Sequence, residues 1–254
     1  MIRNRLQWLN TMVTEPYYFF HFLLFFSYLP IRISSSSIFP PHISLRILRR
    51  EIQAFLAFSI LAFVKMVREE TWEGFIADAL LFGKAFLFLL ALYVDYHLAL
   101  WYMLAFLVLY IVTQQPAFPV LGAVNSMTPL QLESTLIEGN TSRFWLVEFR
   151  SLCSSTCVRL SRNFPELSIT YTNKHLSFGL VDLGLFPNVA EKFAISLTGN
   201  VGLPTYILFE NSSEIARFPG VDFVAKGFHP PITKEYLARH FDLDRLFLEY
   251  LNSK

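Results

Sequence analysis

The sequence has little charge and almost no cysteine. Only 16% of its 254 residues are charged, against about a quarter in ordinary soluble proteins, while 54% are hydrophobic. The formal net charge is +1, and no block of lysine and arginine interleaves with aromatic residues, which excludes a nucleic-acid-binding surface. We therefore expect lipid to be part of the solvent of this protein.

Cysteine occurs only at Cys153 and Cys157, and this scarcity limits the possible chemistry. Two thiols supply half of a tetrahedral zinc site, and no histidine lies within a dozen residues of them. We expect neither a metal nor a cofactor.

All long apolar runs lie before Pro116. The stretches nearly free of charge are 19–29, 54–64, 85–94 and 98–112. A helix needs about 20 apolar residues to cross the hydrocarbon core of a bilayer, with about 17 as a practical minimum. The strongest candidate is 94–113, in which Asp95 and His97 lie at one end, where they can reach headgroups. Residues 1–115 are therefore predicted to form a membrane region with two to four hydrophobic helices.

The stretch 75–94 is also long enough to span, but it contains Asp78 and Lys84. Ionisable side chains at bilayer depth are costly and rare. The two are six residues apart, so a single helix does not place them face to face. We interpret the stretch as a hairpin partner whose charges face other helices or an interface. The alternative is an intramembrane functional pair, which would make membrane transport a third class of function.

The first apolar run admits two interpretations. Arg3 and Arg5 precede it and the serines at 34–37 follow it, which resembles a secretory signal peptide. Because Pro30 and Ile31 fit poorly before a cleavage site, we favour an uncleaved anchor.

The sequence leaves the orientation in the membrane open. If the first two apolar runs both span, the residues between them lie on one side of the membrane and the outer ends of the runs lie on the other side. Each side then carries four basic residues: Arg32, Arg46, Arg49 and Arg50 on the first, and Arg3, Arg5, Lys65 and Arg68 on the second. Because the counts tie, the positive-inside rule does not decide. The sequons at Asn140 and Asn211 could report the compartment, although such triplets also arise by chance. The compartment decides whether Cys157 meets an oxidising or a reducing buffer.

The composition changes near Pro116, where prolines and Gly122 break the periodicity. We predict a linker over 116–127 and one domain over 128–254, which is long enough for a single core. The pattern predicts helices over 128–138, 154–171, 188–195 and 233–251, and strands over 144–149, 178–183, 205–209 and 214–218. This order is typical of an α/β domain with a mixed central sheet and helices on both faces.

Two motifs stand out along this domain. The strand 144–149 leads into Cys153-Ser154-Ser155-Thr156-Cys157, and Leu203-Pro204-Thr205 follows downstream. These motifs resemble those of the thioredoxin superfamily. Looser motifs extend the similarity to the thioredoxin-related transmembrane proteins over almost the whole chain: Glu15-Pro16-Tyr17-Tyr18, Arg50-Glu51-Ile52 and Phe178-Gly179-Leu180-Val181-Asp182. The resemblance implies a thioredoxin-like domain over about residues 128 to 251, preceded by an α-helical membrane region.

The active segment of the superfamily is tryptophan, cysteine, two variable residues and cysteine. With Cys157 as the second cysteine, Ser154 stands where the attacking cysteine belongs and Cys153 where the tryptophan belongs. The resemblance implies that Glu148 is the buried acid that accepts a proton from the second cysteine, and that Pro204 is the cis-proline that faces the thiol. On the residues alone, Glu148 could equally be an exposed or paired strand residue.

A serine hydroxyl cannot be oxidised to a disulfide, so the two-cysteine cycle cannot run at these positions. Three interpretations stay open. Cys157 acts alone as a trapping or sensing thiol, Cys153 acts as a displaced nucleophile that forms a disulfide with Cys157, or both thiols are inert and the domain binds proteins. The second requires the two Cα atoms to lie less than about 7 Å apart.

The resemblance implies a membrane-anchored thioredoxin-like protein of the endoplasmic reticulum, also at mitochondria-associated membranes. We expect redox regulation with little or no dithiol oxidoreductase activity. The alternative is a non-catalytic adaptor whose groove near Pro204 binds extended peptides by strand addition. Expected partners are the membrane and client or regulatory proteins that bind near Cys157 and Pro204, and a homo-oligomer stays open.

Overall fold

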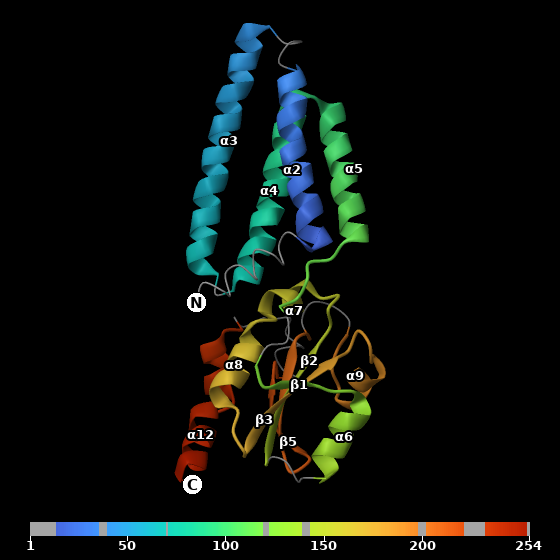
Figure 1. Cartoon of the computed structure of the whole chain (residues 1–254), viewed down its shortest axis with the longest axis vertical. Helices are drawn as coiled ribbons and strands as arrows, with labels where there is room; N and C mark the ends of the chain where they lie inside the picture. Colours follow the sequence, from blue (N-terminus) through green and yellow to red (C-terminus); the bar gives the residue numbers. More distant parts are fainter. Residues whose placement is uncertain are drawn as a thin grey trace. The chain divides into compact units, whose positions relative to one another are not determined.

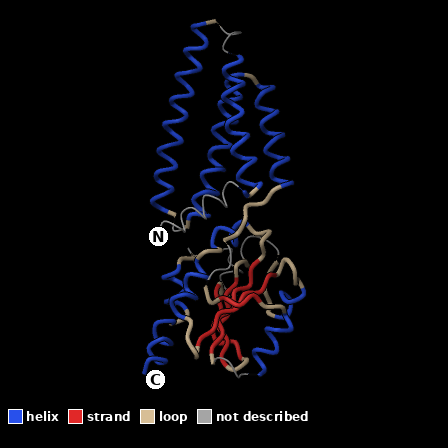
Figure 2. Tube along the Cα trace, viewed as in Figure 1, coloured by secondary structure: helices blue, strands red, loops and turns tan. Residues whose placement is uncertain are grey.

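A computed structural model describes residues 14–35, 40–69, 71–118, 122–138, 143–197, 202–220 and 232–252. The chain divides into two compact units, Met1–Pro116 and Ala117–Lys254. The first unit is helical, and the second combines strands with helices (Figures 1 and 2). The sequon at Asn140 lies outside the described residues.

The described part of the first unit contains helices α2 (Pro16–Ser35), α3 (Pro41–Arg68), α4 (Trp72–Val94) and α5 (Tyr96–Val112). Proline opens both α2 and α3, which suits the first helical position because its N–H has no partner within the helix. Thr71 caps α4 by accepting a hydrogen bond from the Gly74 N–H at 3.2 Å. Helices α2, α4 and α5 share an apolar core that includes Tyr28 and Tyr102.

The predicted span 94–113 contains one apolar helix, α5, which is shorter than the prediction. The chain is extended at Asp95 (φ −160°, ψ 134°) and again at Thr113 (φ −127°, ψ 142°), so the helix covers Tyr96–Val112. Among the described helices, α4 alone is long and apolar enough to cross a membrane by length and composition, and α5 is a shorter apolar helix of 17 residues.

Asp78 and Lys84, two of the charged residues of α4, face neighbouring helices. Asp78 Oδ2 lies 2.6 Å from Lys65 Nζ of α3. The Lys84 ammonium lies 6.0 Å from the ring centroid of Phe106 in α5. The interpretation of this stretch as a hairpin partner is therefore confirmed, and Asp78 and Lys84 do not form a pair with each other.

The second unit is an α/β domain. Its strands are β1 (Val124–Ser126), β2 (Phe144–Arg150), β3 (Leu176–Asp182), β4 (Thr205–Glu210) and β5 (Ser213–Phe218). Its helices in the described residues are α6 (Pro129–Glu138), α7 (Ser155–Leu160), α8 (Asn163–Tyr171), α9 (Asn188–Lys192), α11 (Lys234–His240) and α12 (Leu243–Asn252). The strands form one sheet in the order β1-β3-β2-β4-β5, in which β1, β3 and β2 are parallel and the β2–β4 and β4–β5 pairs are antiparallel.

The mixed sheet separates two apolar clusters, because successive side chains of a strand point to opposite faces. Leu146 of β2 joins one cluster with Phe164 of α8, and Val147 joins the other with Leu132 of α6. Helices α11 and α12 contribute to the first cluster and α9 to the second. All seven residues of β2 are buried, which makes it the central strand. The predicted fold class, a mixed central sheet with helices on both faces, is confirmed.

The single helix predicted over 154–171 is two helices, α7 and α8, which separate at Ser161 and Arg162. Pro165 has no N–H to donate to the carbonyl of Ser161, and its ring would clash with that carbonyl in a continuous helix. At this break the side-chain Oγ of Ser161 accepts a hydrogen bond from the Phe118 N–H at 2.9 Å. The break places α7 as a short separate helix directly after the central strand.

The stretch predicted as a linker contributes a strand to the sheet. β1 pairs in parallel with residues 178–180 of β3. Gly122, just before it, has a φ of 98°, a backbone conformation that residues other than glycine rarely adopt. A strand of three residues is too short for alternation of apolar and polar residues to reveal it.

Candidate functional site

The candidate site begins where β2 ends. The chain leaves Arg150, turns through residues 151–154, and enters α7 at Ser155. The turn is closed by a hydrogen bond from the Ser154 N–H to the Ser151 carbonyl at 3.0 Å, and the Ser154 carbonyl accepts from the Val158 N–H at 3.1 Å. Ser154 is thus the N-cap residue of α7, in an extended conformation, although its side chain makes no capping hydrogen bond.

The two cysteines have opposite environments. Cys153 is exposed in the turn, whereas Cys157, the third residue of α7, is 1% exposed. Both thiols are free. Cys157 belongs to the apolar cluster that includes Phe149 of β2 and Leu203, the residue before Pro204.

Burial controls the chemistry of the Cys157 thiol. It raises the pKa of Cys157 to about 11. Hydrogen bonds from the Ser151 backbone and the Ser154 hydroxyl act in the opposite direction, while the Glu148 carboxylate adds to the rise. Because the thiolate is the nucleophile, Cys157 is a weak nucleophile in this conformation.

Glu148 lies on β2 and is fully buried. Its direct cross-strand partner is Tyr206 of β4, which is also fully buried. Burial raises the pKa of Glu148 to about 7, against the lowering effects of Arg150 and the Tyr206 hydroxyl. Burial, with the nearby Glu148 and Cys157, raises the pKa of Tyr206 well above its usual value. In the described part of the chain, neither Glu148 carboxylate oxygen has a hydrogen bond of acceptable geometry.

Sequence reasoning missed two members of this buried cluster, Arg150 and Tyr206. Arg150 is 6% exposed, and its Nε and Nη1 atoms have no hydrogen-bond partner among the described residues. The sequence carried a signal for Arg150, since a residue two positions after Glu148 on a strand lies on the same face of the sheet as Glu148. The position of Tyr206 depends on the register of β2 against β4, which the sequence does not reveal.

The Leu203–Pro204 peptide bond is cis, and Pro204 comes directly before β4. The first residue of β4, Thr205, pairs with Phe149 near the end of β2. This register brings the prolyl segment to the same edge of the sheet as the turn into α7.

The structure therefore gathers Glu148, Ser154, Cys157 and Pro204 around the carboxyl end of β2, with Cys153 exposed beside them. A single buried thiol next to a titratable carboxyl group can exchange a proton with it, but it cannot complete a dithiol cycle with the Ser154 hydroxyl. Among the described residues, no group of three or more histidine, cysteine or acidic side chains could hold a metal ion.

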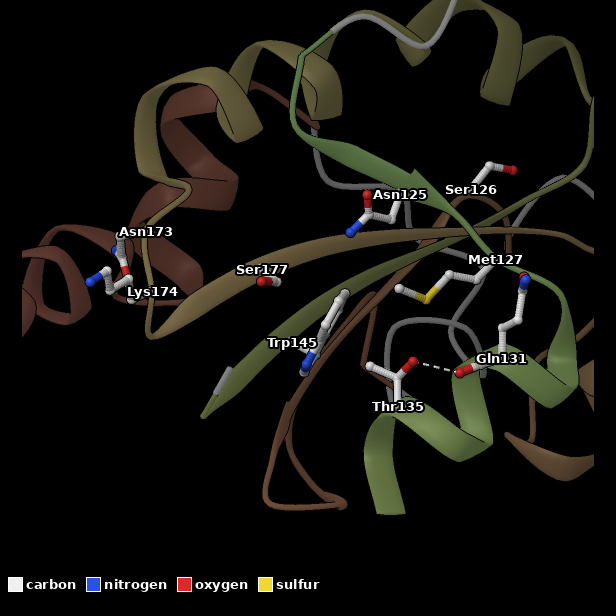
Figure 3. A pocket seen from close by; sticks show the side chains of 9 residues that line it. All are labelled: Asn125, Ser126, Met127, Gln131, Thr135, Trp145, Asn173, Lys174 and Ser177. Carbon is white, nitrogen blue, oxygen red and sulfur yellow. Dashed lines mark hydrogen bonds between the residues drawn. The ribbon is translucent and has the colours of Figure 1, made fainter. Parts of the chain in front are cut away.

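A separate pocket of about 570 Å³ lies between β1, β3 and α6 (Figure 3). Most of its lining residues are of polar types: Asn125, Ser126, Met127, Gln131, Thr135, Trp145, Asn173, Lys174 and Ser177. The five predicted site residues do not line it. The pocket and the buried thiol are therefore distinct features of the domain.

Curated relatives match most of the chain. Thioredoxin-related transmembrane protein 2 of Xenopus tropicalis is 29% identical over 248 residues, covering 92% of this chain and 84% of the relative. Its Drosophila melanogaster homolog is 28% identical over 200 residues, covering 78% of this chain and 74% of the relative. No family model matches the chain.

Solved structures of thioredoxins align with part of the chain. A reduced thioredoxin pre-protein of Schistosoma mansoni matches with a TM-score of 0.33 and 25% identity, covering 42% of this chain and 92% of that structure. A thioredoxin of Nicotiana alata matches with a TM-score of 0.36 and 15% identity, covering 49% of this chain and 98% of that structure. The curated relatives and the sheet order confirm the resemblance: along most of its length this chain is similar to thioredoxin-related transmembrane protein 2, and it combines an α-helical membrane region with a thioredoxin-like domain.

Proposed function

We propose that this protein is a membrane-anchored thioredoxin-like regulator of the endoplasmic reticulum, with little or no dithiol oxidoreductase activity. The observation that carries the proposal is the state of Cys157, which is the one thiol at a family position. It is 1% exposed, its pKa is raised to about 11, and Ser154 stands at the attacking position. In this proposal residues 1–115 anchor the protein in the membrane, and the α/β domain, to which β1 belongs, carries the regulatory function.

Regulation through Cys157 requires the thiol to become accessible. Cys157 is buried in the apolar cluster with Phe149 and Leu203, so a client must open this packing to reach the sulfur. Glu148 could then accept the thiol proton as a general base, because its pKa is near 7. The thiolate could then attack a disulfide of a client, which forms a mixed disulfide with one client sulfur and releases the other as a thiolate. Without a resolving thiol at position 154 this mixed disulfide would release slowly.

The buried thiol also supports the second candidate, a non-catalytic adaptor. In that case Cys157 is a small apolar side chain of the core, and clients bind near Pro204 by strand addition. The endoplasmic reticulum and its contacts with mitochondria are the proposed location for both candidates. Co-localisation of the full-length chain with markers of each compartment tests this location.

The deciding experiment is partner capture by the full-length protein with Cys157→Ser, and with Cys153→Ser as the matched control. A redox role predicts that Cys157→Ser loses the mixed disulfides seen on non-reducing gels, while Cys153→Ser keeps them. An adaptor role predicts that both variants retain the same partners under reducing conditions. Wild-type protein that reduces insulin at the rate of an ordinary thioredoxin would contradict the proposal in both forms.

A further inference from the structure

The end of the first unit at which α2 gives way to α3 carries a cluster of basic side chains. Three exposed arginines, Arg46, Arg49 and Arg50, lie in the first half of α3. Within the described residues none of the three has an acidic partner, and Arg50 donates only to the side chain of Gln53. The one acid nearby, Glu51, is engaged by Arg32 of α2 at 2.8 Å.

The depth of this cluster in a bilayer follows from the turn between α4 and α5. That turn is centred on Asp95 and flanked by the exposed rings of Tyr93 and Tyr96, a polar and aromatic composition that suits the membrane surface. Tyr28 of α2 packs in one cluster with the last turns of α4, and its hydroxyl donates to Glu51 Oε1 at 2.7 Å. Glu51 therefore lies near the level of the membrane surface.

From Glu51 toward Pro41, α3 continues past that level. At about 1.5 Å per residue, Arg50 lies about 1.5 Å and Arg46 about 7.5 Å beyond Glu51 along the helix. In Figure 1 the Pro41 end of α3 extends beyond the turn that joins α4 to α5. The three arginines thus lie at the depth of lipid headgroups rather than in the hydrocarbon.

Exposed apolar side chains accompany the arginines. Leu45, Leu48 and Ile52 are each about half exposed or more, and they alternate with the arginines along the same turns. A helical segment that exposes both basic and apolar side chains is typical of the membrane interface. There the apolar groups enter the acyl boundary and the guanidinium groups meet phosphate.

We propose that Arg46, Arg49 and Arg50 form a binding site for the headgroups of anionic phospholipids. A guanidinium can bind a phosphate through two parallel hydrogen bonds, and three of them within little more than one helical turn complement a negatively charged leaflet. Arg32 has a positioning role, because it joins α2 to α3 through Glu51 and through the Ser44 carbonyl at 3.2 Å. The site is independent of any function of Cys157.

The test uses the full-length protein in nanodiscs that contain phosphatidylcholine and phosphatidylserine with the same acyl chains. Lipids that remain bound after release from the nanodisc are counted by native mass spectrometry at increasing ionic strength. The wild type should retain phosphatidylserine in preference, with the preference falling as salt rises. In the triple variant R46Q/R49Q/R50Q the preference for phosphatidylserine over phosphatidylcholine should fall on the order of 100-fold, since each arginine near the surface contributes about a factor of five.

The matched control is K174Q/R239Q/R245Q, which removes three exposed basic side chains from the second unit. This control should keep the wild-type preference. The variant R46K/R49K/R50K should keep part of the preference for phosphatidylserine, because it retains the positive charges without the bidentate contact. Should the triple variant fail to fold, R46Q alone should still lose the preference about fivefold.

Three results would overturn the proposal. They are equal retention of both lipids by the wild type, equal loss in the control, and full retention in the triple variant. An acidic protein partner at this site, in place of lipid, would produce the first of these results.

Discussion

Glu148 is a carboxyl group whose protonation is tied to folding. Its pKa is raised from 4.5 to about 7 in the folded chain, so between these pH values the folded state binds more protons than the unfolded state. The stability of the domain should therefore fall as pH rises through this window, by up to about 3 kcal/mol, and level off above it. Urea denaturation of residues 117–254 at several pH values measures this.

The variant Glu148→Gln should abolish that fall, because glutamine carries no titrating proton. Glu235→Gln changes an exposed glutamate of α11 and serves as the control, which should keep the wild-type pH profile. A wild-type stability that rises between pH 5 and 7 while Glu148→Gln stays parallel to it would contradict this account.

The two cysteines should differ in reactivity. With its pKa at about 11, Cys157 has a thiolate fraction near neutral pH that is on the order of 100-fold below that of a free cysteine. Cys153, which is exposed, should be alkylated promptly. Peptide mass spectrometry after brief treatment with iodoacetamide, with and without denaturant, resolves the two sites. Equal labelling of both cysteines in the folded protein would show that Cys157 is accessible.

The sequence located part of the candidate site because its residues are close along the chain. Ser154 ends the turn after β2, Cys157 lies in the short helix that follows, and Glu148 lies on the strand before them. Tyr206 reaches the site only through the pairing of β2 with β4, a contact between residues 58 positions apart that no local pattern encodes. The burial that sets the pKa of Cys157 likewise depends on the packed core.

At the scale of elements, α8 anchors one face of the sheet through Phe164. This side chain is fully buried and lies edge-on to Phe178 of β3, with ring centroids 5.4 Å apart. Phe164→Ala should cost about 3 to 5 kcal/mol, because it leaves a cavity that the core cannot fill. Urea denaturation of residues 117–254 gives the change in the free energy of unfolding.

Ile169→Ala, on the exposed face of the same helix, is the matched control and should change stability by less than about 0.5 kcal/mol. If the two variants lost similar stability, α8 would not be packed through Phe164.

Long elements with strong periodicity were predictable, and the interruptions were not. The central strands follow from runs of branched and aromatic residues, as at 144–149. The division between α4 and α5 is an exception, because the polar Asp95 marks it and the predicted stretches 75–94 and 94–113 meet there. β1 forms because its three residues fit the edge of β3, so tertiary pairing rather than local propensity decides it.

At the scale of the whole molecule, the two units should behave differently toward lipid. Residues 1–116 include α4, which is long and apolar enough to span, whereas most large apolar side chains of the second unit are buried in its two clusters. After extraction of membranes with alkaline carbonate, the full-length protein should remain in the pellet. Residues 117–254 expressed alone should be recovered in the supernatant.

Immunoblots of the two fractions measure this, and a lumenal soluble protein serves as the control for extraction. Release of the full-length chain by carbonate would contradict a spanning helix, and pelleting of residues 117–254 would point to a membrane-binding surface on the second unit.

The turn into α7 keeps its backbone hydrogen bonds at Ser154, one turn before a buried sulfur. A serine differs from a cysteine by one atom, and no other change of the main chain is needed to place a second thiol there. The lack of dithiol exchange that we propose therefore depends on a single position, and the substitution Ser154→Cys would supply the second thiol on the same backbone.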